Sequence, residues 1–417
     1  MTWRVGVLRR VGRAPRSTGR HSAARRRLEL RRLLAGVAVV VASSCLVVWS
    51  GPAYAASGSG TGAGTAAPLR QAWTTAQGTW AVLPVGNFAE PNNTFWQLLF
   101  RPAGSSTWKL VTPPGVATNG GLSTTPGSGT TVTIGVQPSI ELAYSPLART
   151  GDAGTTWASG VLAASLLRVP DALATSSGGS SWALERPRGG TLVEAQGSLT
   201  RWRVVATRAR LASTAAGRAC GLAALSAVAV PGGAGGMVEI GASCSREGVV
   251  GILSDQGGRW QEVGPRLGAE ASSTMRVLQL EGSPSGTVAL IEARRGSKVT
   301  LLVLWRSAPG QRWSVSHPLA VHGRIVATDE SGGAQMAVVT AGAGKAPEAF
   351  EVTGPGRAWS ALERLPRGSQ VVAASTAGFV ALAVSRSWVT EWQTPGPGAA
   401  WQRQSRFEVP IQYGSST

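Results

Sequence analysis

Short apolar runs separated by turn-forming residues fill the chain from about residue 69 to its end. Runs rich in β-branched residues, such as 131–136, 300–305 and 335–340, alternate with segments of Gly, Pro and Ser. No run keeps its apolar residues at the spacing of an amphipathic helix. The pattern is typical of many short β-strands joined by tight turns, and it predicts an all-β domain over residues 69–417.

Tryptophans recur in this domain at intervals that indicate a structural repeat. A glycine stands three residues before many of them, as in Gly310-Gln-Arg-Trp313. The repeating positions, spaced 49, 45, 58, 53, 46 and 42 residues apart, are Trp108, Trp157, Trp202, Trp260, Trp313, Trp359 and Trp401. Four short strands fill such an interval, so each interval predicts one blade of a β-propeller. We expect a single propeller of about seven blades. Six or eight are alternatives, because aligning Trp182 in place of Trp202 moves the boundaries.

The stretch before Trp359 shows one predicted blade in full. We expect strands over 324–328, 335–340 and 349–352, with a turn over 329–333 between the first two. A glycine-containing turn then leads into a fourth strand at Trp359. Glycine at such a turn supplies the positive φ that a tight hairpin needs.

One repeat turn resembles an Asp-box, or BNR repeat, whose pattern is Ser/Thr-x-Asp-x-Gly-x-Thr-Trp. Residues 150–157 match the pattern throughout, and residues 175–182 match it with Ser in place of Asp. The matching residues are Asp152, Gly154 and Trp157 in the first copy, and Asp255, Gly257 and Trp260 in a partial copy. The resemblance to exported Asp-box propellers implies a structural role. The box would be a hairpin turn between the outer strands, with Asp bonding backbone N–H groups and Trp packing below.

The first 55 residues have the pattern of an export signal. Residues 1–32 hold eleven of the 40 basic residues and one acidic residue, and 33–49 carry no charge. A Gly-Pro pair and a small-x-small sequence ending at Ala55 follow. We interpret 33–55 as a signal peptide cleaved after Ala55, or alternatively as a membrane anchor. Residues 56–68 form a Gly/Ser/Thr linker. The domain is therefore predicted to be secreted or extracytoplasmic.

The net charge of +19 is concentrated in the leader. Removing the eleven leader arginines from 40 basic residues, and the single leader acid from 21 acidic residues, leaves 29 basic and 20 acidic residues in the rest of the chain. A dense basic patch would favour nucleic-acid binding, whereas this diffuse surplus does not. We expect no nucleic-acid partner, and a membrane contact only through the N-terminal segment if it stays uncleaved.

Cys220 and Cys244 are the candidates for a disulfide. They flank the Gly/Pro-rich segment 231–236, and a hairpin folded about that segment would place them opposite each other. An exported protein meets an oxidising compartment, which favours the bond. The alternative is a pair of buried free thiols.

Enzymatic chemistry has little support in the residues themselves. Phe100-Arg101-Pro102 is similar to the Phe-Arg-Ile-Pro motif of sialidase-like glycosidases but lacks one residue. Beyond the leader, Tyr144 and Tyr413 are the only tyrosines that could serve such a site. The two carboxylates that a glycosidase needs are not marked by any motif. We identify no catalytic residue.

Metal and cofactor chemistry have less support still. His317 and His322 are the histidines of the exported part, and neither has metal-ligand spacing to Cys or to carboxylates. Asp329 and Glu330 could bind Ca²⁺ weakly, but within the predicted turn we expect them to be solvated. No cofactor and no metal ion is predicted.

These observations favour a non-catalytic binding or scaffolding propeller of the cell envelope or the medium. Its partner would be a protein, peptide or glycan on the loop-built top face. A sialidase-like glycoside hydrolase acting on envelope or host glycans is the alternative. Arginines converging with paired carboxylates in the central channel would favour the hydrolase, whereas a channel lined by Ser, Thr and Ala would favour binding.

Overall fold

The computed structural model describes residues 70–86, 94–115, 118, 120–127, 129–136, 143–167, 172–186, 190–231, 237–268, 272–283, 286–331, 335–341, 346–375 and 378–410. The predicted basic region 1–32, the signal segment 33–55 with Ala55, and the linker 56–68 lie outside these residues. Within the described part, no helix is long and apolar enough to cross a membrane. Cleavage and export stay predictions.

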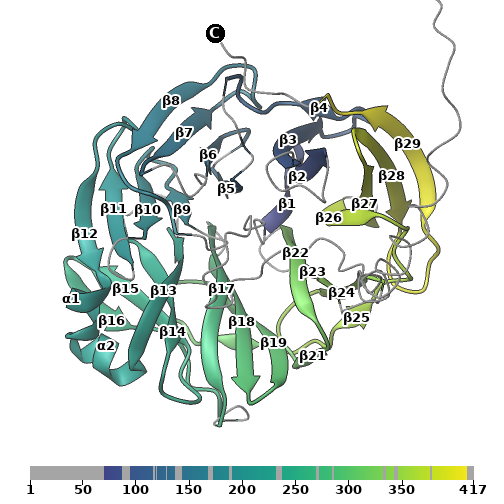
Figure 1. Ribbon diagram of the computed structural model, residues 1–417. Helices are drawn as coiled ribbons and strands as arrows, with labels where there is room; N and C mark the ends of the chain where they lie inside the picture. The colour runs from purple at the N-terminus through teal and green to yellow at the C-terminus, as the bar shows by residue number, and fades with distance from the viewer. Residues whose placement is uncertain are drawn as a thin grey trace, which may run out of the picture. The chain divides into compact units, whose positions relative to one another are not determined.

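The described strands fall into seven blades in chain order, each with four antiparallel strands, and single strand pairs join blades 1 and 6 and blades 4 and 5 into larger sheets (Figure 1). Blade 1 contains β1 (Arg70–Thr75), β2 (Gly78–Gly86), β3 (Thr94–Pro102) and β4 (Lys109–Leu110). Blade 2 contains β5 (Leu122–Pro126), β6 (Val132–Val136), β7 (Ser145–Thr150) and β8 (Ala158–Leu162). Blade 3 contains β9 (Leu173–Thr175), β10 (Ser181–Glu185), β11 (Thr191–Ala195) and β12 (Arg203–Thr207).

The remaining blades follow the same plan. Blade 4 contains β13 (Leu222–Ala229), β14 (Glu239–Cys244), β15 (Gly251–Gln256) and β16 (Arg259–Glu262). Blade 5 contains β17 (Thr274–Ser283), β18 (Gly286–Arg295), β19 (Lys298–Arg306) and β20 (Ser314–Val315), and β21 (Leu319–Val321) also pairs with β19. Blade 6 contains β22 (Arg324–Ser331), β23 (Gln335–Ala341), β24 (Glu348–Val352) and β25 (Ser360–Ala361). Blade 7 contains β26 (Ser369–Ser375), β27 (Gly378–Ser385), β28 (Trp388–Thr394) and β29 (Gln402–Glu408). The short helices α1 (Arg208–Ala212) and α2 (Ala215–Cys220) join blades 3 and 4.

The apolar core is divided among the interfaces between blades. Buried apolar side chains of the described residues form seven clusters, and each cluster joins two neighbouring blades, including blades 7 and 1. On β2, Ala81 and Leu83 pack toward blade 7, whereas Trp80 and Val82 pack toward blade 2. Successive side chains of a strand point to opposite faces, so one strand fills two interfaces. Seven interfaces for seven blades close the ring.

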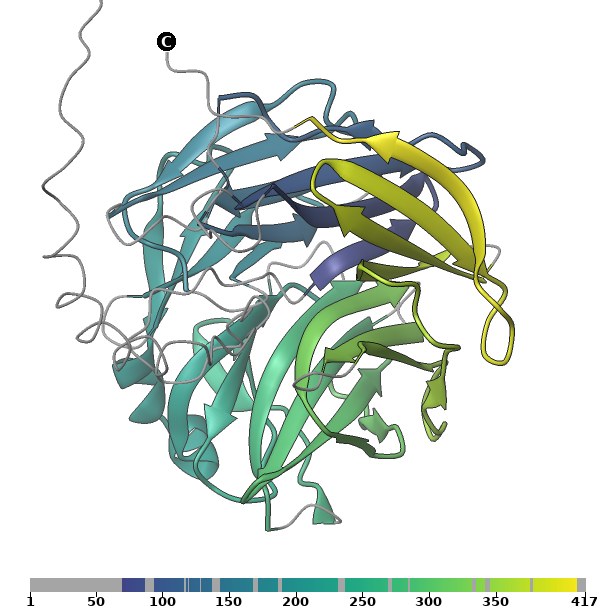
Figure 2. The same ribbon diagram turned by 45° about the vertical axis from the view of Figure 1, so that its right-hand side comes forward.

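The inner strands of blades 1 and 6 also pair directly. β1 runs parallel to β22, with Trp73 opposite Glu330 and Arg70 opposite Thr328. Both views place β1 beside the inner end of β22 (Figures 1 and 2). The inner strand of blade 7, β26, packs against both strands without entering their ladder. Blades 1 and 6 are therefore hydrogen-bonded to each other directly, although blade 7 lies between them in the ring.

The predicted fold class and blade number are confirmed, because the described strands form seven four-stranded blades. Six of the seven repeat tryptophans directly precede the fourth strand of their blade, and Trp260 lies within it. Four of them donate an indole hydrogen bond to a carbonyl of the preceding blade, 2.6 to 3.1 Å away. These four are Trp202, Trp313, Trp359 and Trp401. Trp182 lies in β10, a second strand, so the alternative alignment was wrong.

Two details of the strand prediction were also wrong. Residues 329–331, expected in a turn, belong to β22 instead, because the strand continues to Ser331 and its last four residues pair with β1. The two helices between blades 3 and 4 were not predicted. They are short, and Thr207 and Thr214 cap them by accepting hydrogen bonds from the backbone N–H groups of Arg210 and Gly217.

Candidate functional site

A polar cleft of about 420 Å³ lies between blades 1 and 7. Its walls come from the β1–β2 and β3–β4 turns of blade 1 and from β26, β28 and β29 of blade 7. Seven serines and threonines, two glutamines, five small residues, Arg101 and Glu391 line it. The cleft has the size of a small-molecule site, and most of its lining side chains can form hydrogen bonds.

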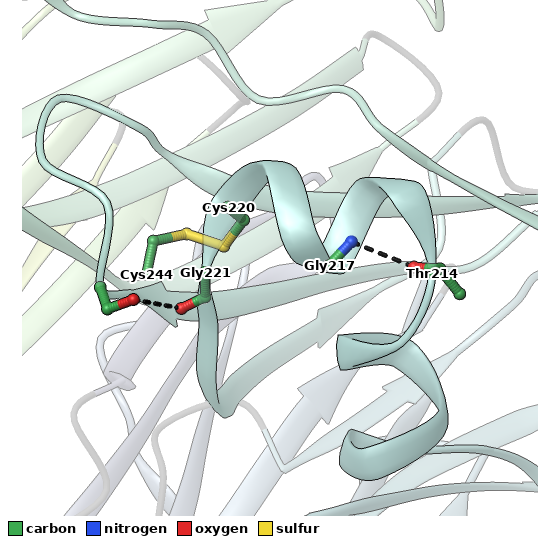
Figure 3. Close-up of a disulfide and its surroundings, with 6 residues drawn as sticks. Thr214, Gly217, Cys220, Gly221 and Cys244 are labelled. Atoms are coloured by element: carbon green, nitrogen blue, oxygen red, sulfur yellow. Dashed lines mark hydrogen bonds between the residues drawn. A yellow bond between two sulfur atoms is a disulfide. The ribbon is translucent and has the colours of Figure 1, made fainter.

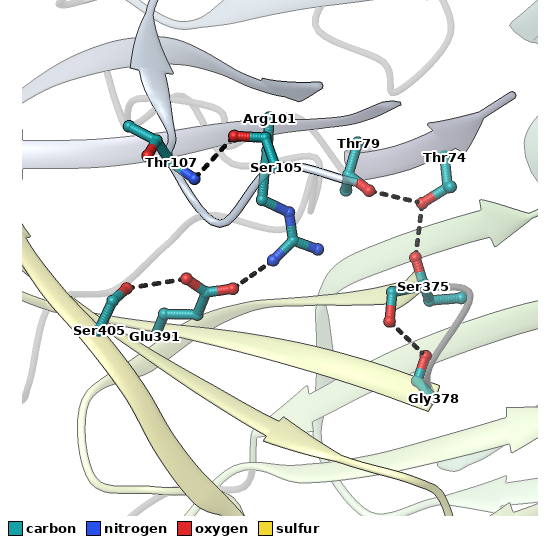
Figure 4. Close-up of polar contacts among 10 residues, drawn as sticks. Thr74, Thr79, Arg101, Ser105, Thr107, Ser375, Gly378, Glu391 and Ser405 are labelled. Carbon is teal, nitrogen blue, oxygen red and sulfur yellow. Dashed lines mark hydrogen bonds and ion pairs between the residues drawn. The ribbon is translucent and has the colours of Figure 1, made fainter. Parts of the chain in front are cut away.

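Arg101 reaches this cleft from the end of β3. Its guanidinium lies 5.0 Å from the centre of the Trp108 ring, and its Nη1 donates to Oε1 of Glu391 on β28 (Figure 4). The other carboxylate oxygen of Glu391 accepts a hydrogen bond from Ser405 on β29, at 2.8 Å. The Arg101 side chain is 15% exposed and that of Glu391 is 3% exposed. The arginine therefore faces the cleft while the carboxylate lies behind it.

Hydroxyl groups join the two blades on the other wall of the cleft. Thr74 Oγ1 donates to the carbonyl oxygen of Ala374 at 2.5 Å and lies 3.3 Å from Thr79 Oγ1 (Figure 4). Ser375 donates to the carbonyl oxygen of Gly378 at 3.2 Å. Since Thr74 belongs to blade 1 and Ala374 to blade 7, one hydrogen bond crosses the interface and links the two sides of this wall.

The position of the cleft differs from our expectation. It opens beside the turns between first and second strands and between third and fourth strands. The chain passes from one blade to the next at the opposite ends of these strands, on the side where we expected the partner to bind. The candidate site is therefore on the other face of the ring.

A second Arg–Glu pair has the same design but is closed to solvent. Arg306 at the end of β19 lies 4.5 Å from the centre of the Trp313 ring and donates to Glu239 of blade 4. Both side chains are 1% exposed. Burial raises the pKa of the Glu239 carboxyl, and the Arg306 charge opposes that shift. This pair fills an interface, whereas the Arg101–Glu391 pair lines a cleft.

A buried polar cluster occupies the inner strands where blades 1 and 6 meet. Arg70 of β1 pairs with Glu281 of β17 and, in the amide orientation that satisfies both groups, with Gln279. Asp329 of β22 is 1% exposed, and its Oδ2 accepts from the backbone N–H of Ala374. Its Oδ1 has no hydrogen-bond partner among the described residues. Burial raises the Asp329 pKa to about 7, and the hydrogen bond from Ala374 and the Arg70 charge oppose the shift.

The expected solvation of Asp329 and Glu330 was wrong, because both are buried within β22. The cluster does place Arg70 near two carboxylates, those of Glu281 and Asp329, and such an arrangement would favour a hydrolase. Arg70 is 3% exposed, however, and Asp329 is 1% exposed. A substrate cannot reach buried groups, so this cluster is a part of the ring closure rather than an open site.

The first Asp-box turn is held by its aspartate. Asp152 accepts hydrogen bonds from the Thr156 hydroxyl at 2.6 Å, from the Thr156 backbone N–H at 2.9 Å and from the Thr150 hydroxyl at 2.7 Å. These bonds lower the Asp152 pKa to about 2. Gly154 has a φ of 85°, and a Cβ there would lie 2.4 Å from Val111. Trp157 is half-buried and packs against the cluster between blades 1 and 2.

The partial copy in blade 4 keeps fewer of these contacts. Asp255 accepts from the Gly258 N–H at 2.7 Å, Gly257 has a φ of 64°, and Trp260 packs between blades 3 and 4. The copy over residues 175–182 lies in a different turn, between β9 and β10, the first and second strands of blade 3. The expectation that an Asp-box copy lies between the outer strands was therefore wrong for this copy. Membership in the Asp-box family stays a prediction.

The structure contains the Cys220–Cys244 disulfide (Figure 3). Cys244 ends β14, and Cys220 ends helix α2 just before β13. β13 and β14 do form a hairpin, with Leu222 opposite Cys244. The expected hairpin is therefore present, but one cysteine comes from a helix that caps it. The bond ties the helical insertion to blade 4.

Sequence reasoning missed most of the cleft. It considered Arg101 as part of a degenerate motif and gave Glu391 no role. Arg101 and Arg306 each stand seven residues before a repeat tryptophan, and this shared spacing is the signal that could have found both pairs. Tyr144 is 45% exposed and does not line the cleft, and Tyr413 lies outside the described residues. No group of three or more metal-ligating side chains occurs in the described ranges.

No protein-family model matches the chain, and no curated protein matches its sequence. Solved structures with a similar arrangement include the Aleuria aurantia lectin bound to alpha-methyl-L-fucoside, at 13% identity and a TM-score of 0.42, covering 71% of this chain and 95% of that one. Prolyl oligopeptidase B from Galerina marginata has 9% identity and a TM-score of 0.44, covering 80% and 50%. The polysaccharide lyase Uly1 has 9% identity and a TM-score of 0.38, covering 82% and 90%. At these values none of them lends its ligand or activity to this chain.

Proposed function

We propose that this chain is an exported, non-catalytic propeller that binds glycans in the cleft between blades 1 and 7. The observation that carries the proposal is the lining of the cleft, where seven hydroxyl side chains, two amides and one guanidinium surround a space of about 420 Å³. Sugars present many hydroxyl groups in fixed directions, and such side chains match them as donors and acceptors. The leader supports a location where envelope or host glycans are accessible.

The same lining argues against the hydrolase alternative. Glycoside hydrolysis requires two carboxyl groups on either side of the scissile bond. The cleft residues include one carboxylate, Glu391, whose two oxygens already accept hydrogen bonds from Arg101 and Ser405. A binding role needs no second carboxylate.

A glycan array probed with the purified full chain tests the proposal. We expect a restricted set of positive glycans, and isothermal titration with one of them should give a single site. Gln404→Trp, which fills the cleft from β29, should abolish binding. Gln402→Trp is the matched control, because Gln402 is exposed on the same strand but does not line the cleft.

Two results would contradict the proposal. The first is an array without positive glycans, or binding that survives Gln404→Trp. The second is release of the fluorophore from methylumbelliferyl glycosides by the full chain, with loss of the activity in Glu391→Gln. That outcome would establish the hydrolase instead.

A further inference from the structure

The charge of the cleft is balanced within one contact. Arg101 and Glu391 are the charged residues of its lining, and they form an ion pair with each other. Arg101 is held from two sides, by the Glu391 carboxylate and by the face of the Trp108 ring. A ligand therefore meets a guanidinium whose position is fixed and whose charge is already neutralised.

Arg101 keeps donors for a ligand. A guanidinium has five N–H groups, and the hydrogen bond to Glu391 uses only Nη1. Nε and Nη2 make no hydrogen bond with the described residues. A sugar hydroxyl can accept from these N–H groups without bringing a second charge into the cleft. A ligand carboxylate would lose its hydration, would meet no uncompensated cation, and would come close to Glu391.

We infer that the cleft selects uncharged sugar residues over acidic ones, and that Glu391 determines this specificity. The inference rests on the proposed glycan-binding function. Glu391 acts through Arg101: it fixes the direction of the guanidinium and cancels its charge. Removing the carboxylate charge while keeping an oxygen acceptor should leave Arg101 in place and make it attractive to acidic sugars.

The buried Arg306–Glu239 pair provides an internal control. It has the same partners, an arginine over a repeat tryptophan and a glutamate of the preceding blade, but no cleft beside it. Glu239→Gln makes the same chemical change between blades 4 and 5. It can alter stability, but it should not alter the preference among glycans.

The test compares two sets of glycans with the full chain. One set ends in uncharged hexoses, and the other is matched in size but ends in glucuronic acid or N-acetylneuraminic acid. We expect the wild-type chain to bind the uncharged set. Glu391→Gln should shift the ratio of affinities toward the acidic set by roughly tenfold. Glu239→Gln should leave the ratio unchanged.

A second variant tests the inference without changing Glu391, so the result does not depend on how Glu391→Gln affects the fold. Gln393→Arg places an additional cation in the cleft wall, and it should also shift the ratio toward acidic glycans. The inference is overturned if the wild-type chain binds both sets equally, or if Glu391→Gln and Gln393→Arg retain binding with an unchanged ratio. Absence of glycan binding by the wild-type chain would overturn the proposed function itself, which separates the two failures.

Discussion

Asp329 should make the stability of the propeller depend on pH. Its carboxyl is buried where β1, β22 and β26 meet, and its pKa is raised from 3.8 to about 7. The folded protein therefore binds this proton more tightly than the unfolded chain does. The stabilising contribution of the protonated form is fully present below pH 3.8, and it is lost as pH rises toward 7. At about 1.4 kcal/mol per pKa unit, the loss is on the order of 4 kcal/mol.

Replacing Asp329 with Asn removes the titration and keeps the shape. The amide oxygen of Asn can still accept the hydrogen bond from Ala374, and Arg70 keeps its partner Glu281. We expect Asp329→Asn to have a higher free energy of unfolding than the wild-type chain at pH 8. The advantage should shrink steadily below pH 7, because the wild-type carboxyl becomes neutral there.

Urea denaturation followed by tryptophan fluorescence at pH 4, 5, 6, 7 and 8 measures the effect. The informative quantity is the difference in free energy of unfolding between variant and wild type, since groups shared by both cancel. Asp255→Asn, a turn carboxylate of blade 4, serves as the control for the chemical change. Parallel pH profiles for Asp329→Asn and the wild-type chain would show that Asp329 does not titrate differently in the folded and unfolded states.

Three further predictions test the repeat, the disulfide and the leader. Trp313→Ala and Trp359→Ala should each lower the free energy of unfolding by about 3 kcal/mol in urea titrations, because both indoles are half-buried and donate a hydrogen bond to the preceding blade. Unequal effects, or effects no larger than that of the exposed control Trp388→Ala, would contradict the equivalence of the two positions. Cys220→Ser should lower the free energy of unfolding by roughly 3 to 4 kcal/mol in oxidising buffer. As a control, the variant and the wild-type chain should be equally stable once both are reduced. N-terminal sequencing of chain recovered from the medium should begin near Ala56, whereas recovery of only membrane-bound, full-length chain would favour the anchor.

The sequence predicts the features of this fold that are encoded locally. A tryptophan at the start of each fourth strand repeats because every blade has the same outer turn, so spacing alone indicates seven blades. The same local pattern misleads at residues 175–182, since a Gly-x-x-Trp turn suits the first hairpin of a blade as well as the last. Local pattern identifies the turn but not its place in the blade.

The cleft and the central cluster depend on partners that are remote in the chain. Arg101 and Glu391 are 290 residues apart, so neither marks the other in the sequence. Asp329 stands in an Asp-Glu-Ser-Gly-Gly stretch that has the composition of a turn. It lies in a strand because β1 pairs with its backbone and Arg70 supplies a nearby cation. In the sequence alone, polar residues that such distant contacts bury cannot be told apart from surface residues.

The direct pairing of β1 with β22 has a consequence for how the chain folds. Each blade is built from hairpins of neighbouring residues, which form quickly, but Arg70 and Thr328 meet across 258 positions, from 70 to 328. Until the seventh blade is in place, the face of β2 that carries Ala81 and Leu83 has no cover. The slow step should therefore be the arrival of the C-terminal blades at the first one. In that interval the unfinished propeller exposes apolar surface and is most vulnerable to aggregation.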